Sequence, residues 1–195
     1  EFPCYGIVDL DYYWFHPELD SEASDVLVLD ENNLESFVLF DAPTFESWNH
    51  SGDSEVLSNI IQCAKLLGIF RCINHTFDRK WRFKPDGGSN NLGYHLRPEI
   101  RRMFSINETL SPAAFLIDLL NLYDFSQSEY DVLETQILNS PNYTLSRLIN
   151  GKDLDMFLSI SNRPHVFRNA ADKFELVQFR NTTLGIRLEP LGVLG

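Results

Sequence analysis

Two aspartates near the N-terminus have the spacing of a metal-binding pair. Asp9 and Asp11 flank Leu10 at the end of a predicted strand, and such D-x-D pairs hold Mg²⁺ in phosphoryl-transfer enzymes and nucleases. Residues 1–64 contain 14 acidic residues and no Lys or Arg, so acidic pairs also arise there by chance. We therefore predict a non-enzymatic chain without metal or cofactor. A metal-dependent phosphoryl-transfer site at Asp9 and Asp11 is the alternative.

The other residue types that carry chemistry form no catalytic pattern. The five histidines show neither H-x-H nor H-E-x-x-H spacing, and no serine lies in a G-x-S-x-G motif. The three cysteines, Cys4, Cys63 and Cys72, are too scattered for a disulfide framework or a C-x-x-C metal site. Buried thiols in a reducing compartment explain them best, which predicts an intracellular protein, cytoplasmic or nuclear.

Five sequons for N-glycosylation keep a second location open. An asparagine is followed two residues later by Ser or Thr at Asn49, Asn74, Asn107, Asn142 and Asn181. An Asn-rich chain produces such matches easily. A secreted or lumenal glycoprotein domain is therefore the alternative to an intracellular protein.

A basic and aromatic stretch follows the acidic N-terminal segment. Residues 65–102 contain nine Lys or Arg against three acids, although the net charge of the whole chain is −12. Basic side chains interleaved with aromatic rings bind single-stranded nucleic acid by charge and stacking. Within 71–102, the candidates for RNA binding are Arg79, Lys80, Trp81, Arg82, Lys84, Arg101 and Arg102. The competing interpretation places Trp81 inward on a strand, with the basic side chains in solvent.

The elements that would position these residues divide the chain into two parts, 1–110 and 111–195. In the first, strands are predicted at 5–15, 69–73 and 81–84, and 26–29 pairs with 36–40 as a hairpin. A helix is predicted from Asp53 or Ser54 to Leu67, with Gly68 ending it. The second part opens on a helix that Ser111 caps, with Pro112 at its first position.

Residues 126–188 show the element order of a winged helix. Ser126 and Glu129 form a capping box, Thr144 and Asp153 are predicted to cap two further helices, and 174–177 and 184–188 alternate as a strand pair. The third helix would be the DNA reader, but it carries Asp153 and Asp155. This acidic balance favours a protein partner, with Lys152, Asp155 and Arg163 as the candidate interface residues.

The stretch 154–177 resembles the third helix and following strand of LOTUS (OST-HTH) domains. The matching positions are Phe157, Leu158, Pro164, Val166, Phe167, Phe174 and Leu176. The resemblance implies an RNA-regulatory setting, in which the domain binds a DEAD-box helicase, structured RNA or another protein.

Taken together, the sequence predicts an α+β fold. A small antiparallel sheet with helices, in the N-terminal part, would pack on a winged-helix-like C-terminal module. The predicted function is a non-catalytic protein-interaction or adaptor module whose partner is another protein, and the alternative is a single-stranded RNA-binding domain. No apolar run approaches the roughly 18 residues of a membrane span, so no membrane partner is predicted.

Overall fold

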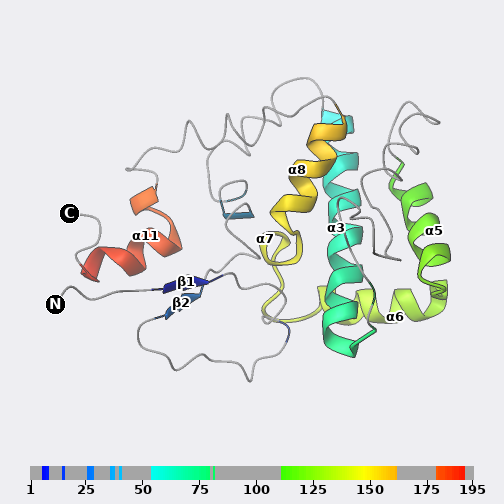
Figure 1. Ribbon diagram of the computed structural model, residues 1–195, viewed down its shortest axis with the longest axis horizontal. Helices are drawn as coiled ribbons and strands as arrows, with labels where there is room; N and C mark the ends of the chain where they lie inside the picture. Colours follow the sequence, from blue (N-terminus) through cyan, green and yellow to red (C-terminus); the bar gives the residue numbers. More distant parts are fainter. Residues whose placement is uncertain are drawn as a thin grey trace, which may run out of the picture.

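The protein is organised around one long helix. The computed structural model describes residues 6–8, 15, 26–28, 36–37, 40, 54–79, 81, 111–161 and 179–191. Within them, helix α3 (Ser54–Phe77) runs through the centre, and α5 (Pro112–Leu122), α6 (Gln127–Leu138), α7 (Leu145–Leu148) and α8 (Gly151–Ile160) pack against it (Figure 1). These helices from both sides of residue 110 share one hydrophobic core.

Helix α3 is amphipathic in its first half and buried all round in the middle. Leu57, Ile60, Ala64 and Leu67 form a buried stripe at helical spacing, and residues 67–70 are then all buried. A continuous apolar run of this kind has no periodicity that separates a buried helix from a buried strand. The strand predicted at 69–73 is therefore wrong, because these residues continue the helix.

Gly68 does not end α3, because the helix uses it for close packing. A Cβ at this position would lie 2.5 Å from the carbonyl oxygen of Leu148, so only glycine lets α7 approach α3 this closely. The helix continues to Phe77, and Asp78 then adopts a left-handed conformation with φ 45°. Aspartate tolerates that conformation at a helix C-terminus better than most residues.

The helices of the C-terminal half begin at the residues that the capping signals predict. The side chains of Ser111, Ser126 and Thr144 accept hydrogen bonds from backbone N–H groups three residues later, at the starts of α5, α6 and α7. The cap predicted for α8 is wrong, since Asn150 and not Asp153 caps that helix. Asn150 lies immediately before α8 and its side chain accepts from the N–H of Lys152.

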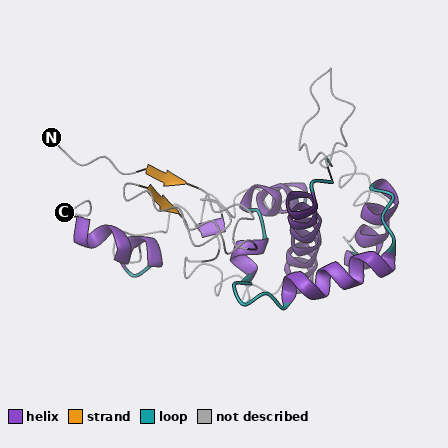
Figure 2. Ribbon diagram, turned by 90° about the horizontal axis from the view of Figure 1, so that it is seen from below, coloured by secondary structure: helices purple, strands orange, loops and turns teal. Residues whose placement is uncertain are grey.

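The predicted α+β class is wrong, because the described part of the chain is helical. Its extended pairing is limited to β1 (Gly6–Val8) and β2 (Val26–Val28), which run parallel and lie near one end of the molecule (Figure 2). The predicted hairpin is also wrong, because β2 pairs with β1 and Ser36 and Phe37 are helical. The residues 82–84 and 174–177, also predicted as strands, lie outside the described ranges.

The second strand of the predicted wing is a helix. Residues Thr183–Leu188 form α11, which the buried Thr182 caps and which leads into the short 3-10 helix η2 (Glu189–Leu191). Leu184 and Leu188 are buried while Ile186 is 59% exposed, which is the pattern of a helix and not of a strand. Alternation of Leu184, Ile186 and Leu188 misled the strand prediction, because i and i+4 also share a helix face.

By length and composition, α3 is the one helix among the described residues that could cross a membrane. In this structure 56% of that apolar window is buried inside the protein. Core helices of globular proteins meet the same criterion, and α3 is covered by four other helices.

Candidate functional site

Of the seven predicted RNA-binding residues, the structure describes Arg79 and Trp81. Both lie just after the end of α3, and both contact residues between Tyr123 and Glu129, where α5 leads into α6. The other five, Lys80, Arg82, Lys84, Arg101 and Arg102, lie outside the described residues. Their role in RNA binding therefore stays a prediction.

Trp81 belongs to an aromatic cluster. Its ring stacks on Tyr123 with centroids 4.8 Å apart, meets Phe125 edge-on at 5.3 Å and lies 5.7 Å from Phe70. The side chain of Asn74 also holds its backbone. The Trp81 N–H donates to Asn74 Oδ1 at 2.7 Å, and Asn74 Nδ2 donates to the Trp81 carbonyl at 3.2 Å. Trp81 thus packs against its own chain, as the inward-facing interpretation expected, although not from a strand.

Arg79 contacts the start of α6. Its Nη2 donates to Glu129 Oε1 in an ion pair, and its Cζ lies 5.5 Å from the centroid of the Phe125 ring. A guanidinium over an aromatic face is an attractive cation–π contact. Both members of the ion pair are partly exposed, with 38% of the Arg79 side chain and 44% of the Glu129 side chain accessible. The pair is therefore open to solvent and to competing charges.

The predicted protein-interface residues lie on the first two turns of α8. Lys152 is exposed and Asp155 is half-buried, while Arg163 lies outside the described ranges. Asp153 lies between Lys152 and Asp155 in the sequence, but its side chain points toward Arg71 of α3. The sequence predicted a capping role for Asp153, and the structure gives it a different one.

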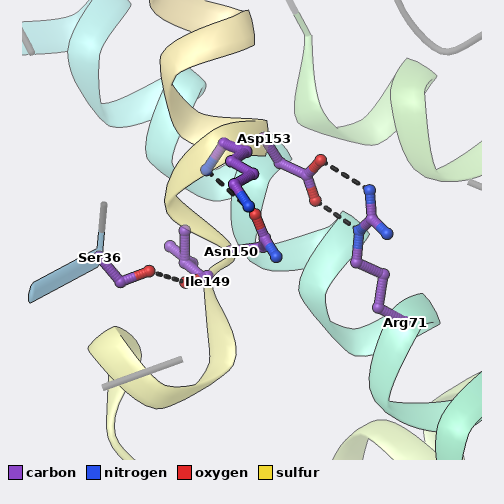
Figure 3. Close-up of polar contacts among 6 residues, drawn as sticks. Ser36, Arg71, Ile149, Asn150 and Asp153 are labelled. Carbon is purple, nitrogen blue, oxygen red and sulfur yellow. Dashed lines mark hydrogen bonds and ion pairs between the residues drawn. The ribbon is translucent and has the colours of Figure 1, made fainter. Parts of the chain in front are cut away.

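Asp153 forms a buried ion pair with Arg71 of α3. Arg71 Nε donates to Asp153 Oδ2 at 2.5 Å and its Nη2 donates to Oδ1 at 2.7 Å (Figure 3). The side chains are 18% and 6% exposed. Sequence reasoning missed this pair, since nothing in the sequence connects an arginine in an apolar run with an aspartate 82 positions later.

The ion pair balances two opposing effects on the Asp153 carboxyl. Burial raises the pKa of Asp153, and the adjacent Arg71 guanidinium lowers it through charge and hydrogen bonding. A two-pronged arginine–carboxylate contact is directional, so it fixes α8 against α3. Next to it, Ser36 donates to the carbonyl of Ile149 at 2.6 Å, which ties the N-terminal segment to the same junction (Figure 3). The arrangement is structural.

The two described thiols are core groups. Cys63 and Cys72 are both fully buried, and Cys4 lies outside the described residues. Burial raises the pKa of Cys72 to about 12. Burial also raises the pKa of Cys63. Neutral, inaccessible thiols are poor nucleophiles and poor metal ligands.

These thiols predict a loss of stability in alkali. A raised folded-state pKa favours the neutral thiol, so the contribution is complete below the unfolded pKa of about 8.5 and disappears as the pH rises toward the folded value. From about pH 9 upward, ionisation of each thiol in the unfolded state should lower the free energy of unfolding by roughly 1.4 kcal/mol per pH unit. Urea unfolding of the wild type and of a Cys63→Ala/Cys72→Ala variant, at several alkaline pH values, measures this. Parallel pH curves for the two proteins would refute the prediction.

The three sequons that the structure describes differ in the surroundings of their asparagine side chains. Asn74 uses its side-chain amide to hold the Trp81 backbone, and a glycan on its Nδ2 would leave that nitrogen a single hydrogen and place a sugar beside this contact. Asn142 and Asn181 are exposed and lie in turns before α7 and α11. Asn49 and Asn107 lie outside the described ranges. The sequon at Asn74 therefore fits a structural use of asparagine, and the glycoprotein alternative stays a prediction.

A metal site finds no support in the part of the chain that the structure describes. There, no group of three or more His, Cys, Asp or Glu side chains is placed to hold a metal ion. Asp9 and Asp11 lie outside the described residues, so the predicted alternative at that pair is not decided.

Comparison with known proteins adds no relative. No family model, no curated protein and no solved structure matches this chain.

Proposed function

We propose that this chain is a non-catalytic protein-interaction module. The observation that carries the proposal is the presence of exposed apolar side chains on both α5 and α6. Ile117 and Val132 are each 57% exposed there, and Leu122 is 37% exposed. Apolar side chains with a polar surround are what protein interfaces bury at their centre.

The charge on these helices supports a protein over a nucleic acid. Residues 111–146 include five acids, Asp118, Asp124, Glu129, Asp131 and Glu134, and no Lys, Arg or His. Phosphate binding requires clustered cations, because affinity comes from releasing counterions of the nucleic acid. An acidic and apolar surface has the opposite chemistry.

The chemistry-bearing groups of the core are consistent with this function. Asp153 is engaged by Arg71, and Cys63 and Cys72 are buried in the core. The resemblance of 154–177 to LOTUS domains supports an RNA-regulatory setting for the partner. The strand that this resemblance implies lies outside the described residues.

Capture from a native extract, with and without ribonuclease, tests the proposal. The full chain is immobilised, and bound proteins are identified by mass spectrometry after a matched wash. We expect a stoichiometric protein partner that survives ribonuclease and that binds again when purified. Capture that depends on intact RNA, or direct binding of single-stranded RNA without a protein partner, would favour the basic stretch 71–102 instead.

A further inference from the structure

The connection between α5 and α6 already holds one cationic side chain. We define the α5–α6 corner as residues 122–129, which include the last residue of α5, the turn and the first residues of α6. The two helices meet there at a sharp angle, beside the C-terminal end of α3 (Figure 1). Arg79 leaves α3 at this end and places its guanidinium between Glu129 and the face of Phe125.

The corner is built for a guanidinium in particular. Phe125 is 7% exposed and is held edge-on by Trp81 and by Phe70, so its ring is a fixed platform. Glu129 lies in the first turn of α6, where Ser126 caps the helix and fixes its start. A planar guanidinium can stack on a ring and pair with a carboxylate together, which an ammonium group does less well.

Among the described residues, the charged side chains around the corner, apart from Arg79, are acidic, and others are apolar. Asp124 is exposed within it, and Asp131 and Glu134 follow on α6. Leu122 lies at the corner and Phe77, 44% exposed, ends α3 two residues before Arg79. The chemistry that complements this surface is basic and apolar.

The resident contact is weak enough to be exchanged. Exposed ion pairs contribute little to stability, because solvent competes for both charges. The aromatic packing of Trp81 does not depend on Arg79, since Asn74 holds the Trp81 backbone from α3. Arg79 can therefore leave the corner while the aromatic cluster stays in place.

We propose that the α5–α6 corner docks a basic segment of a partner protein, whose arginine takes the place of Arg79 between Glu129 and Phe125. This inference rests on the proposed interaction function and assigns it a surface and a partner chemistry. Arg79 is then the intramolecular competitor of the partner arginine. Removing its side chain should strengthen binding, and removing the Glu129 charge should weaken it.

A peptide titration tests the corner directly. The probe is a fluorescent helical peptide of arginine and leucine, with lysine–leucine and glutamate–leucine peptides as matched controls. Wild-type chain should prefer the arginine peptide. Arg79→Ala should bind it up to about five times more tightly, which is the factor that an exposed ion pair can supply. Glu129→Gln should bind it more weakly by a similar factor.

Two controls make the outcome decisive. Glu55→Gln removes an exposed acid at the opposite end of α3 and should leave binding unchanged. Circular dichroism confirms that each variant is folded. Equal affinity for the arginine and glutamate peptides, or equal affinity of wild type, Arg79→Ala and Glu129→Gln, would overturn the proposal.

Capture from extract separates failure of the corner from failure of the function. If Glu129→Gln loses the ribonuclease-resistant partner, the result supports both the docking site at the corner and the interaction function. If capture persists in Glu129→Gln but is lost in Lys152→Glu/Asp155→Arg, the corner is wrong and the partner binds the predicted surface of α8. If wild type captures only RNA-dependent material, the interaction function fails, and the peptide titration still decides whether the corner binds arginine.

Discussion

Replacing Asp153 with alanine should destabilise the protein by about 3–5 kcal/mol, the usual cost of removing one member of a buried ion pair. The loss exceeds that of an exposed pair because Arg71 would keep its charge without a counter-charge. Only 18% of its side chain is accessible, so water would solvate that charge poorly. The guanidinium would lose both hydrogen bonds that Asp153 accepts, at 2.5 and 2.7 Å. Denaturant unfolding of both proteins measures the difference.

The double variant Arg71→Met/Asp153→Leu distinguishes a lost pair from a lost helix contact. Replacing both charges with apolar groups of similar volume is often neutral or stabilising. We therefore expect the double variant to recover most of the stability that Asp153→Ala loses. A cost below about 1 kcal/mol for Asp153→Ala, typical of an exposed pair, would show that the two side chains are solvated.

Replacing Phe70 with alanine should lower the free energy of unfolding by about 3–5 kcal/mol. Phe70 is fully buried at the centre of the aromatic cluster, with its ring centroid 5.5 Å from Tyr130, 5.7 Å from Tyr123 and Trp81 and 6.1 Å from Phe125. Its removal leaves a cavity that four rings line, and rings are too rigid to fill it.

The chain offers a matched control for this substitution. Phe77 belongs to the same helix two turns later and is 44% exposed. Phe77→Ala should cost only about 1 kcal/mol, because close to half of the Phe77 surface is already in solvent and its removal leaves no enclosed cavity. Similar losses for Phe70→Ala and Phe77→Ala, measured by denaturant unfolding, would mean that the aromatic cluster is not the centre of this core.

Local signals predicted where helices begin, and long-range contacts determined the rest. Ser111, Ser126 and Thr144 each cap a helix as predicted, since a cap depends on residues within one turn. Residues 69–73 were misassigned because an all-round buried helix and a buried strand have the same apolar composition. The use of Gly68 depends on the backbone of α7, 80 positions away along the chain, which no local pattern contains.

The candidate site was predictable to a similar degree. The basic and aromatic composition identified Arg79 and Trp81 as notable residues, and the structure gives both of them contacts within the chain. Their partners Glu129, Tyr123 and Asn74 could not be found from spacing, because each contact joins different elements or a side chain to a turn. Phe157 and Leu158, two of the positions that match LOTUS domains, are both fully buried on α8, whereas Phe167 and Phe174 lie outside the described residues.

Helix α3 is one continuous helix at the centre of a helical core, and the other contacts follow from it. Arg71, Asn74 and the exit of Arg79 toward the α5–α6 corner are all placed by it. Backbone chemical shifts and amide hydrogen exchange across residues 54–77 of the full chain test this directly. We predict helical shifts throughout and the slowest exchange over 60–73, without a break at Gly68. Strand-like shifts at 69–73, or fast exchange that begins at Gly68, would contradict it.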